Sequence, residues 1–197
     1  MPSLISGYEY DIFISYRQKD NKYEDWVTEF VDNLRKELAA TFKEEVSIYF
    51  AVNPYDGLQE THDVDAPLGE KDKCLIFIPI LSQTYCDPNS FAWANELLAF
   101  RDFSSASAPG LKVRMPNGNV ASRILPIRIH ELDNVDVKLF EDETGGLIRP
   151  IDFILRSPGV NRPFYGHRGG GIRYDTPILF ASPNSATSHR SGGVCSR

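Results

Sequence analysis

Residues 10–20 decide the fold, and they read Tyr10-Asp-Ile-Phe-Ile-Ser-Tyr-Arg-Gln-Lys-Asp20. An apolar run of this length, ending abruptly in hydroxyl, aromatic and charged residues, is typical of a buried strand that opens into a loop. Ligands of open α/β sheets gather at the carboxyl ends of the strands. We therefore expect Ser15, Tyr16 and Arg17 to lie at a binding site.

Further apolar runs and amphipathic segments alternate along the chain. Strands are predicted at Tyr10–Tyr16, Val46–Phe50, Lys73–Leu81, Arg123–Ile129 and Pro150–Leu155. Helices are predicted from about Trp26 to Leu38, from about Phe91 to Asp102, and at Leu132–Phe140. This alternation indicates α/β architecture: a flavodoxin-like, doubly wound, five-stranded parallel sheet of order 2-1-3-4-5, with helices on both faces.

Two local features refine this prediction. Asn21 and Glu24 have the spacing of a capping box, which predicts Asn21 as the N-cap of the first long helix. Pro79 lacks a backbone donor and is expected to weaken the end of the third strand.

Composition limits the classes of protein to consider. The chain has 197 residues, of which 42% are hydrophobic, enough for one sizeable core. We expect one domain over residues 1–156 and a Gly/Ser-rich, mobile tail over 157–197. The net charge of -6 argues against nucleic-acid binding. No signal peptide and no apolar run of bilayer length is present, so we expect a soluble, cytoplasmic protein that does not bind membranes.

Reactive groups outside the strand ends have mostly structural interpretations. Cys74, Cys86 and Cys195 form no Cys-x-x-Cys pair and have no basic partner in the sequence, which favours structural thiols. Glu60, His62, Asp63 and Asp65 lack the tight register of a hard-metal loop, and a solvated loop is favoured there. His130 is interpreted as a surface or core-edge residue.

A second set of polar residues follows the third strand. Ser82 ends that strand, and Trp93 and Glu96 are three positions apart on the next helix. The first and third strands would be neighbours where the sheet order reverses, and their carboxyl ends would form a crevice there. Residues three apart are neighbours on a helix surface, so an aromatic face and a carboxylate would lie together beside this crevice. The alternative is that Trp93 packs into the core and Glu96 is a solvated helix acid. The spacing alone favours this alternative.

Three segments in this order resemble the Toll/interleukin-1 receptor (TIR) domain family. Residues 11–16 match its first signature box, residues 75–82 look like its third strand with the closing serine, and residues 91–97 look like the helix that carries the catalytic glutamate of active members. The resemblance covers about residues 8–155 and is closest to stand-alone bacterial TIR proteins. Ala92 stands where members often have tryptophan, and the Gly/Ser-rich tail replaces the usual closing helix.

The resemblance implies an enzyme that cleaves the nicotinamide–ribose bond of NAD+ and acts in bacterial defence signalling. Its product would be ADP-ribose or a cyclic ADP-ribose. It implies Glu96 as the catalytic residue, with NAD+ as substrate and neither a cofactor nor a metal. Substrate binding is assigned to Ser15, Tyr16, Arg17, Ser82 and Trp93.

The resemblance also implies self-association. The loop from Asn53 to Gly69 stands where the family has its BB loop, and Tyr55, Asp56, Gly57 and His62 are the expected contacts with other TIR domains. Activity would depend on this assembly, and a separate protein would act as sensor or effector.

Two other classes of protein share this predicted topology. A non-catalytic TIR–TIR interaction module explains the fold and the loop without a role for Glu96, and it stays open. A phosphoacceptor receiver domain fits poorly, because Asp11 lies at the start of its strand and the third strand ends in Ser82.

Overall fold

The central sheet is built around β1 (Tyr10–Ser15), the strand predicted from the opening stretch. In the computed structural model β1 lies between β2 (Ile48–Tyr49) and β3 (Cys74–Leu81). The sheet continues through β6 (Ile127–Arg128) to β7 (Ile151–Asp152), and all neighbours are parallel. The order β2-β1-β3-β6-β7 is the flavodoxin-like order 2-1-3-4-5, so the predicted fold class is confirmed.

The structure describes residues 3–23, 25–50, 73–146, 149–157 and 160–163. All of them belong to one unit, which spans Met1–Tyr165. The proposed interaction loop, the Cys195 thiol and nearly all of the predicted tail lie outside the described residues. No helix in the described part is long and apolar enough to cross a membrane.

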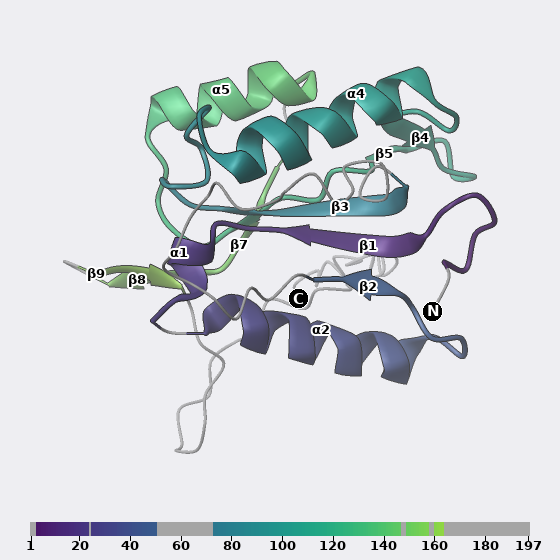
Figure 1. Ribbon diagram of the computed structural model, residues 1–197, viewed down its shortest axis with the longest axis horizontal. Helices are drawn as coiled ribbons and strands as arrows, with labels where there is room; N and C mark the ends of the chain where they lie inside the picture. Colours follow the sequence, from purple (N-terminus) through teal and green to yellow (C-terminus); the bar gives the residue numbers. More distant parts are fainter. Residues whose placement is uncertain (1–2, 24, 51–72, 147–148, 158–159, 164–197) are drawn as a thin grey trace, which may run out of the picture. The chain divides into compact units, whose positions relative to one another are not determined.

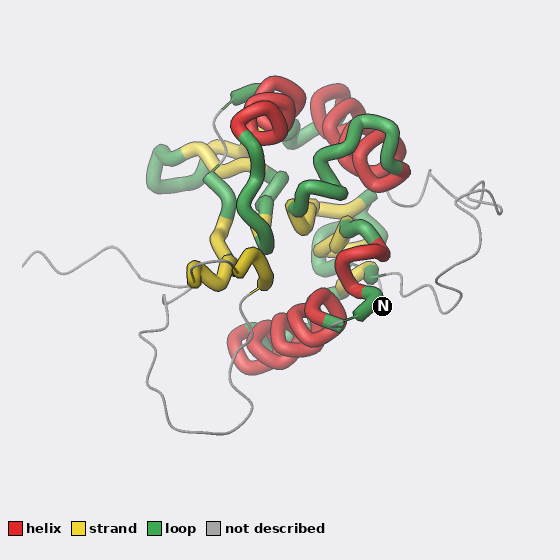
Figure 2. The backbone as a smooth tube through the Cα atoms, turned by 90° about the vertical axis from the view of Figure 1, so that its left-hand side faces the viewer, coloured by secondary structure: helices red, strands yellow, loops and turns green. Residues whose placement is uncertain are grey.

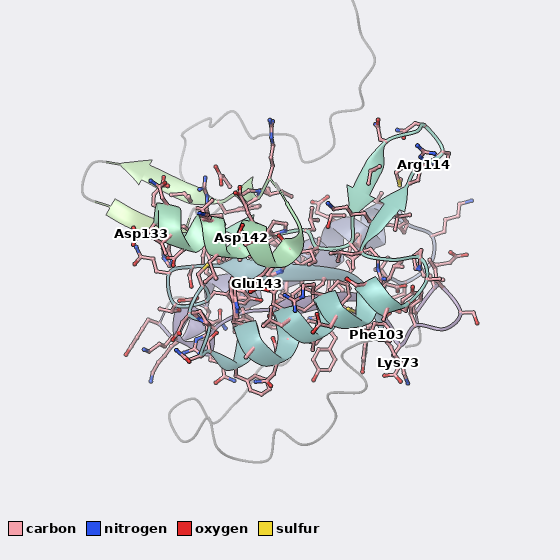
Figure 3. The ribbon with its side chains drawn as sticks, turned by 90° about the horizontal axis from the view of Figure 1, so that it is seen from above. Lys73, Phe103, Arg114, Asp133, Asp142 and Glu143 are labelled. Atoms are coloured by element: carbon pink, nitrogen blue, oxygen red, sulfur yellow. The ribbon has the colours of Figure 1, made fainter. Side chains whose placement is uncertain are left out.

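Helices cover both faces of the sheet, as Figures 1 and 2 show. α2 (Trp26–Thr41) covers one face. α4 (Leu98–Ala106) and α5 (Asn134–Thr144) lie side by side over the other, and Figure 3 shows them from above. A short helix, α1 (Gln18–Asn21), follows β1 at the carboxyl end of the sheet.

Alternation along β1 divides the core into two clusters. Phe13 faces α4 and α5, where it stacks on Phe77 at 5.4 Å between ring centroids. Ile12 and Ile14 face α2, where they pack with Trp26 and the other apolar residues of that helix. Ser15 has the same parity as Phe13, so strand periodicity places its hydroxyl on the α4/α5 face.

The first long helix has the predicted apolar stripe but a different amino-terminal cap. Asn21 is the last residue of α1, and α2 begins five residues later at Trp26. The Asn21 Oδ1 nevertheless accepts hydrogen bonds from the backbone N–H groups of Val27 (2.9 Å) and Thr28 (3.2 Å). Asn21 therefore satisfies two orphan donors of α2 from the preceding helix, and the prediction that it is the N-cap residue is wrong.

Pro79 lies inside β3 and interrupts pairing on one side only. It is in register with Ser15 of β1. Toward β6, an isolated bridge joins Phe77 to Ile124, and regular pairing resumes at Ile80 and Ile127. A residue without a backbone N–H fits this gap in the ladder.

Two antiparallel hairpins were not predicted from the sequence. The first joins β4 (Lys112–Arg114) to β5 (Val120–Ser122), and the second joins β8 (Ile154–Ser157) to β9 (Val160–Pro163). The second hairpin crosses the boundary expected at residue 156. Regular structure therefore reaches at least residue 163, beyond the start predicted for the tail.

The Asp11 carboxylate joins the start of β1 to neighbouring segments through hydrogen bonds. Its side chain is 4% exposed and accepts hydrogen bonds from the Ser3 hydroxyl, the Leu4 N–H, and the N–H and hydroxyl of Ser47. Burial by itself would raise the pKa of the Asp11 carboxyl, but these hydrogen bonds outweigh it and hold the pKa below its ordinary value.

This depressed pKa predicts a pH-dependent contribution to stability. A carboxyl whose pKa is lower in the folded state stabilises the fold above its unfolded pKa, about 4, and loses that effect as pH falls through the folded value. Asp11→Asn should therefore lower the free energy of unfolding at pH 7, and the difference from the parent should shrink below about pH 4. Urea unfolding at both pH values measures this. Asp142→Asn, an exposed position on α5, is the matched control, and an Asp11→Asn deficit that is independent of pH would contradict the assignment.

Candidate functional site

Ser15 and Glu96 meet at the carboxyl end of the sheet. The Ser15 Oγ, fully buried at the end of β1, donates a hydrogen bond of 2.7 Å to the Glu96 Oε2. Glu96 belongs to the helical segment after β3 and is partly exposed. The two halves of the predicted crevice are thus brought into direct contact, at the point where the strand order reverses.

Tyr85 completes this hydrogen-bonded chain from within the core. Its hydroxyl lies 2.8 Å from the Ser15 Oγ, and the residue is fully buried. Burial, with a further contribution from the charge of Glu96, raises the pKa of the Tyr85 phenol well above its ordinary value, so the phenol keeps its proton at neutral pH. Since the single proton of Ser15 goes to Glu96, Tyr85 is the donor to Ser15.

The segment that carries Glu96 begins as a π-helix. η1 (Ala92–Leu97) has π-helical bonding and passes directly into α4. The Ser90 Oγ supports its start by accepting from the Trp93 N–H at 3.2 Å. A π-helix has more residues per turn than an α-helix, and such segments are frequent at functional sites. Two residues three positions apart are therefore separated by a wider angle about the helix axis than in the α-helix that the sequence predicted.

The consequence is that Trp93 and Glu96 point in different directions. Trp93 is 1% exposed and packs edge-to-face against Tyr85 and Phe140, with ring centroids 6.3 Å from each. Glu96 turns toward Ser15 instead. The structure thus agrees with the core interpretation of Trp93 and disagrees with its interpretation as a stacking surface, because the ring has no exposed face. Glu96 is not the solvated helix acid of the alternative interpretation, because its carboxylate accepts a hydrogen bond from Ser15.

A second acid, Asp20, lies close to the same strand ends. It accepts hydrogen bonds from the hydroxyls of Ser82 (2.5 Å) and Thr84 (2.9 Å). Burial raises the pKa of the Asp20 carboxyl, although these bonds and the nearby His130 and Arg17 oppose the shift.

Ser82 connects Asp20 to Tyr85. The Ser82 Oγ is buried and accepts from the Tyr85 N–H at 3.0 Å. Ser82 therefore positions α1 and the chain after β3, and its hydroxyl is already engaged in these contacts rather than turned toward open space. Tyr85 links both acids, through its backbone to Ser82 and through its hydroxyl to Ser15.

Tyr16 and Arg17 lie between β1 and α1, and both are partly exposed. The ring centroid of Tyr16 lies 5.3 Å from that of Phe50. Both rings pack at the edge of the core cluster between the sheet and α2, called here the α2-side cluster. Arg17 is close enough to Asp20 to influence its ionisation. Tyr55, Asp56, Gly57 and His62 lie outside the described residues.

The remaining reactive groups have structural surroundings. Cys74 and Cys86 are buried and form no disulfide in the described part of the chain, and burial raises the pKa of Cys86 to about 12, so this thiol is protonated at neutral pH. His130 is partly buried, two residues after β6 ends. Within the described ranges, no cluster of three or more His, Cys, Asp or Glu residues has the arrangement of a metal site; the Glu60–Asp65 cluster lies outside them.

Sequence reasoning missed Tyr85 and gave Asp20 no role. Tyr85 follows Ser82 by three residues, a spacing that suits a turn but does not reveal that its hydroxyl reaches β1. Asp20 closes the opening stretch, where it reads as one more charged loop residue.

Tyr85→Phe tests the buried hydroxyl. The substitution keeps the ring that packs on Trp93 and removes the donor to Ser15, so we expect a loss of about 1 kcal/mol in unfolding free energy. Urea denaturation measures the change. Tyr10→Phe, on the same sheet but with a hydroxyl that forms no hydrogen bond in the described part of the chain, should change stability by less than about 0.5 kcal/mol. Equal effects of the two substitutions would contradict the hydrogen bonds from Tyr85 to Ser15 and from Ser15 to Glu96.

Comparisons with known proteins add one structural likeness. No family model and no curated protein matches the chain. One matching solved structure is described as the activated Roq1 resistosome directly recognizing the pathogen effector XopQ, in its TIR domains. The match has 14% identity and a TM-score of 0.40, and covers 69% of this chain and 66% of that one, just under two thirds of its length. A likeness of this size carries no argument, and the fold class follows from the strand order itself.

Proposed function

We propose that the chain is a TIR-type enzyme that cleaves the nicotinamide–ribose bond of NAD+, with Glu96 as the catalytic residue. The observation that carries the proposal is the Ser15–Glu96 hydrogen bond at the carboxyl end of β1. This hydrogen bond joins the first signature box to the glutamate-bearing helix, two of the three segments on which the family resemblance rests. The π-helical start of that helix is a second supporting feature.

The chemistry suits a carboxylate in this place. Nicotinamide leaves as a neutral ring from a cationic pyridinium and needs little acid catalysis. The ribose then develops positive charge, as in other glycoside cleavages. Glu96 would hydrogen-bond the ribose hydroxyls and stabilise that charge. Water adds to the ribose carbon and releases a proton to solvent, which gives nicotinamide, ADP-ribose and H+; attack by the adenosine end of the substrate would give a cyclic product.

The surrounding residues would have separate roles. Ser15, which accepts a hydrogen bond from the Tyr85 hydroxyl, would fix the orientation of the Glu96 carboxylate. Arg17, partly exposed after β1, is proposed to contact the pyrophosphate, since arginine binds phosphate oxygens in a bidentate manner. Tyr16 is the remaining aromatic candidate for contact with a substrate ring. Trp93 is left out of the substrate site because of its burial.

Self-association belongs to the proposal through the family resemblance. The loop from Asn53 to Gly69 would contact a second copy, and the enzyme would be active only when assembled. A separate sensor or effector protein would then control assembly.

The test is the release of free nicotinamide from NAD+ by the purified protein, followed by chromatography, in dilute solution and under crowding that promotes assembly. We expect turnover per molecule to rise with protein concentration. Separation of the second product shows whether it is linear or cyclic. Assembly without nicotinamide release would contradict the enzyme and favour the non-catalytic interaction module.

A further inference from the structure

A cavity of about 270 Å³ lies over the carboxyl end of the sheet, and neither Ser15 nor Glu96 lines it. Its apolar wall is formed by Leu81 at the end of β3, by Leu132, and by Val137 and Phe140 of α5. Ligands of open α/β sheets occupy this end of the strands. The volume falls just below the usual range for drug-sized ligands, so a molecule with a single ring fits it.

Two arginines give the cavity its polar character. The Arg128 Nε and Nη2 donate to the two carboxylate oxygens of Asp152, at 2.8 and 2.9 Å. That pairing uses two of the five N–H donors of a guanidinium. Arg149 is exposed and forms no ion pair within the described residues. Glu141 supplies one acidic group on the α5 side. The arrangement offers arginine donors to an anionic group at the edge of an apolar space.

A continuous series of contacts joins this cavity to Glu96. Phe140 lines the cavity and packs edge-to-face on Trp93, which packs edge-to-face on Tyr85. The Tyr85 hydroxyl is bonded to Ser15, and Ser15 to Glu96. Each of these residues except Glu96 is at most 3% exposed. Close-packed interiors transmit displacement, so a ligand that moves Phe140 acts on the orientation of the Glu96 carboxylate.

We infer that this cavity binds a small carboxylate with an apolar ring, held by Arg149 and the wall of α5, and that its occupation changes the activity at Glu96. The second half of this inference rests on the proposed function; the first half does not.

Binding is tested with three probes of one shape and different charge: benzoate, benzamide and benzylamine. The chain contains two tryptophans, and Trp26 lies in the α2-side cluster on the other face of the sheet. In a Trp26→Phe background, Trp93 is the only tryptophan and reports on the cavity through Phe140. We expect a saturable change in Trp93 emission with benzoate, a weaker one with benzamide and none with benzylamine, and the same ranking by ligand-observed NMR.

Substitutions locate the site. Arg149→Gln should weaken benzoate binding about tenfold, because a charge-assisted hydrogen bond is lost. Val137→Phe should fill the cavity and abolish binding. Arg35→Gln, an exposed arginine of α2, is the matched control and should bind as the parent does. Equal binding of benzylamine, unchanged binding in Val137→Phe, or no saturable signal by either method would overturn the site.

Coupling is tested in the nicotinamide assay. Benzoate should change the rate in the parent by severalfold and leave the rate of Arg149→Gln unchanged, while both proteins have the same rate without benzoate. Benzoate that binds without changing the parent's rate would overturn the coupling. If no nicotinamide is released under any condition, the proposed function fails, and the fluorescence titration still decides whether the cavity binds carboxylates.

Discussion

Glu96→Gln is expected to lower nicotinamide release from NAD+ by about 100-fold or more. Glutamine has the same size and its amide oxygen can still accept from Ser15, so the site keeps its shape. It lacks the negative charge that would stabilise the developing positive charge on the ribose. Loss of one preorganised electrostatic contact of this kind typically costs a factor of about 10²–10³. Initial rates at saturating NAD+, under assembling conditions, measure the effect.

Glu37→Gln is the matched control for this prediction. Glu37 is an exposed acid on α2, which covers the opposite face of the sheet, so its loss should leave the rate unchanged. Circular dichroism and thermal unfolding should be the same for parent, control and variant. Turnover by Glu96→Gln equal to that of the parent would refute the catalytic assignment.

Trp93→Ala is expected to destabilise the fold by about 3–5 kcal/mol. Trp93 is among the largest fully buried side chains in the described core and packs between Tyr85 and Phe140. Truncation removes its apolar contacts and leaves a cavity that the surrounding helices and strands fill only in part. Urea unfolding at neutral pH measures the loss, and the variant should unfold at a clearly lower urea concentration.

Trp93→Phe separates this structural role from a role in substrate binding. Phenylalanine keeps an aromatic ring in the core, so most of the stability should return, and the KM for NAD+ should stay within about twofold. A stacking role for Trp93 predicts the opposite pattern, with a raised KM in both variants and little loss of stability. That pattern would contradict the buried position of the ring.

Sheet order and the two faces of the core could be predicted from the sequence because they depend on apolar periodicity. The near-continuous run of β3 predicts a central strand, and the stripe of α2 predicts one buried face. Both follow from the need to bury apolar side chains, and the positions of those side chains are visible in a single sequence. Strand ends were less accurate: the predicted strand Val46–Phe50 is regular only at Ile48–Tyr49.

The irregular features could not be predicted in this way. The π-helical segment is bonded differently from an α-helix, but its apolar residues have spacings that suit both. The two hairpins have short strands, and those of β4 and β5 are mostly exposed, so they lack an apolar pattern. Arg123 was placed at the start of a predicted strand, yet it is buried and donates to three backbone carbonyl groups, those of Cys74, Leu75 and Gly110.

The candidate site was predicted in part. Ser15 and Glu96 were each identified, from the strand end and from the family resemblance, and the structure brings them together. The contacts that hold them are long-range: Tyr85 lies 70 residues after Ser15, and Ser82 lies 62 residues after Asp20. Hydrogen bonds of this kind depend on the final packing of elements, and a local sequence pattern does not contain them.

The most direct test of the central claim, that Ser15 acts through the Glu96 carboxylate, is a double-mutant cycle on the rate of nicotinamide release. Glu96→Asp keeps a carboxylate but is one methylene too short to reach Ser15. We predict that Ser15→Ala lowers the rate about tenfold in the parent and less than twofold in the Glu96→Asp background, since coupled residues are not additive. The same factor in both backgrounds, or no nicotinamide from the parent, would contradict the account.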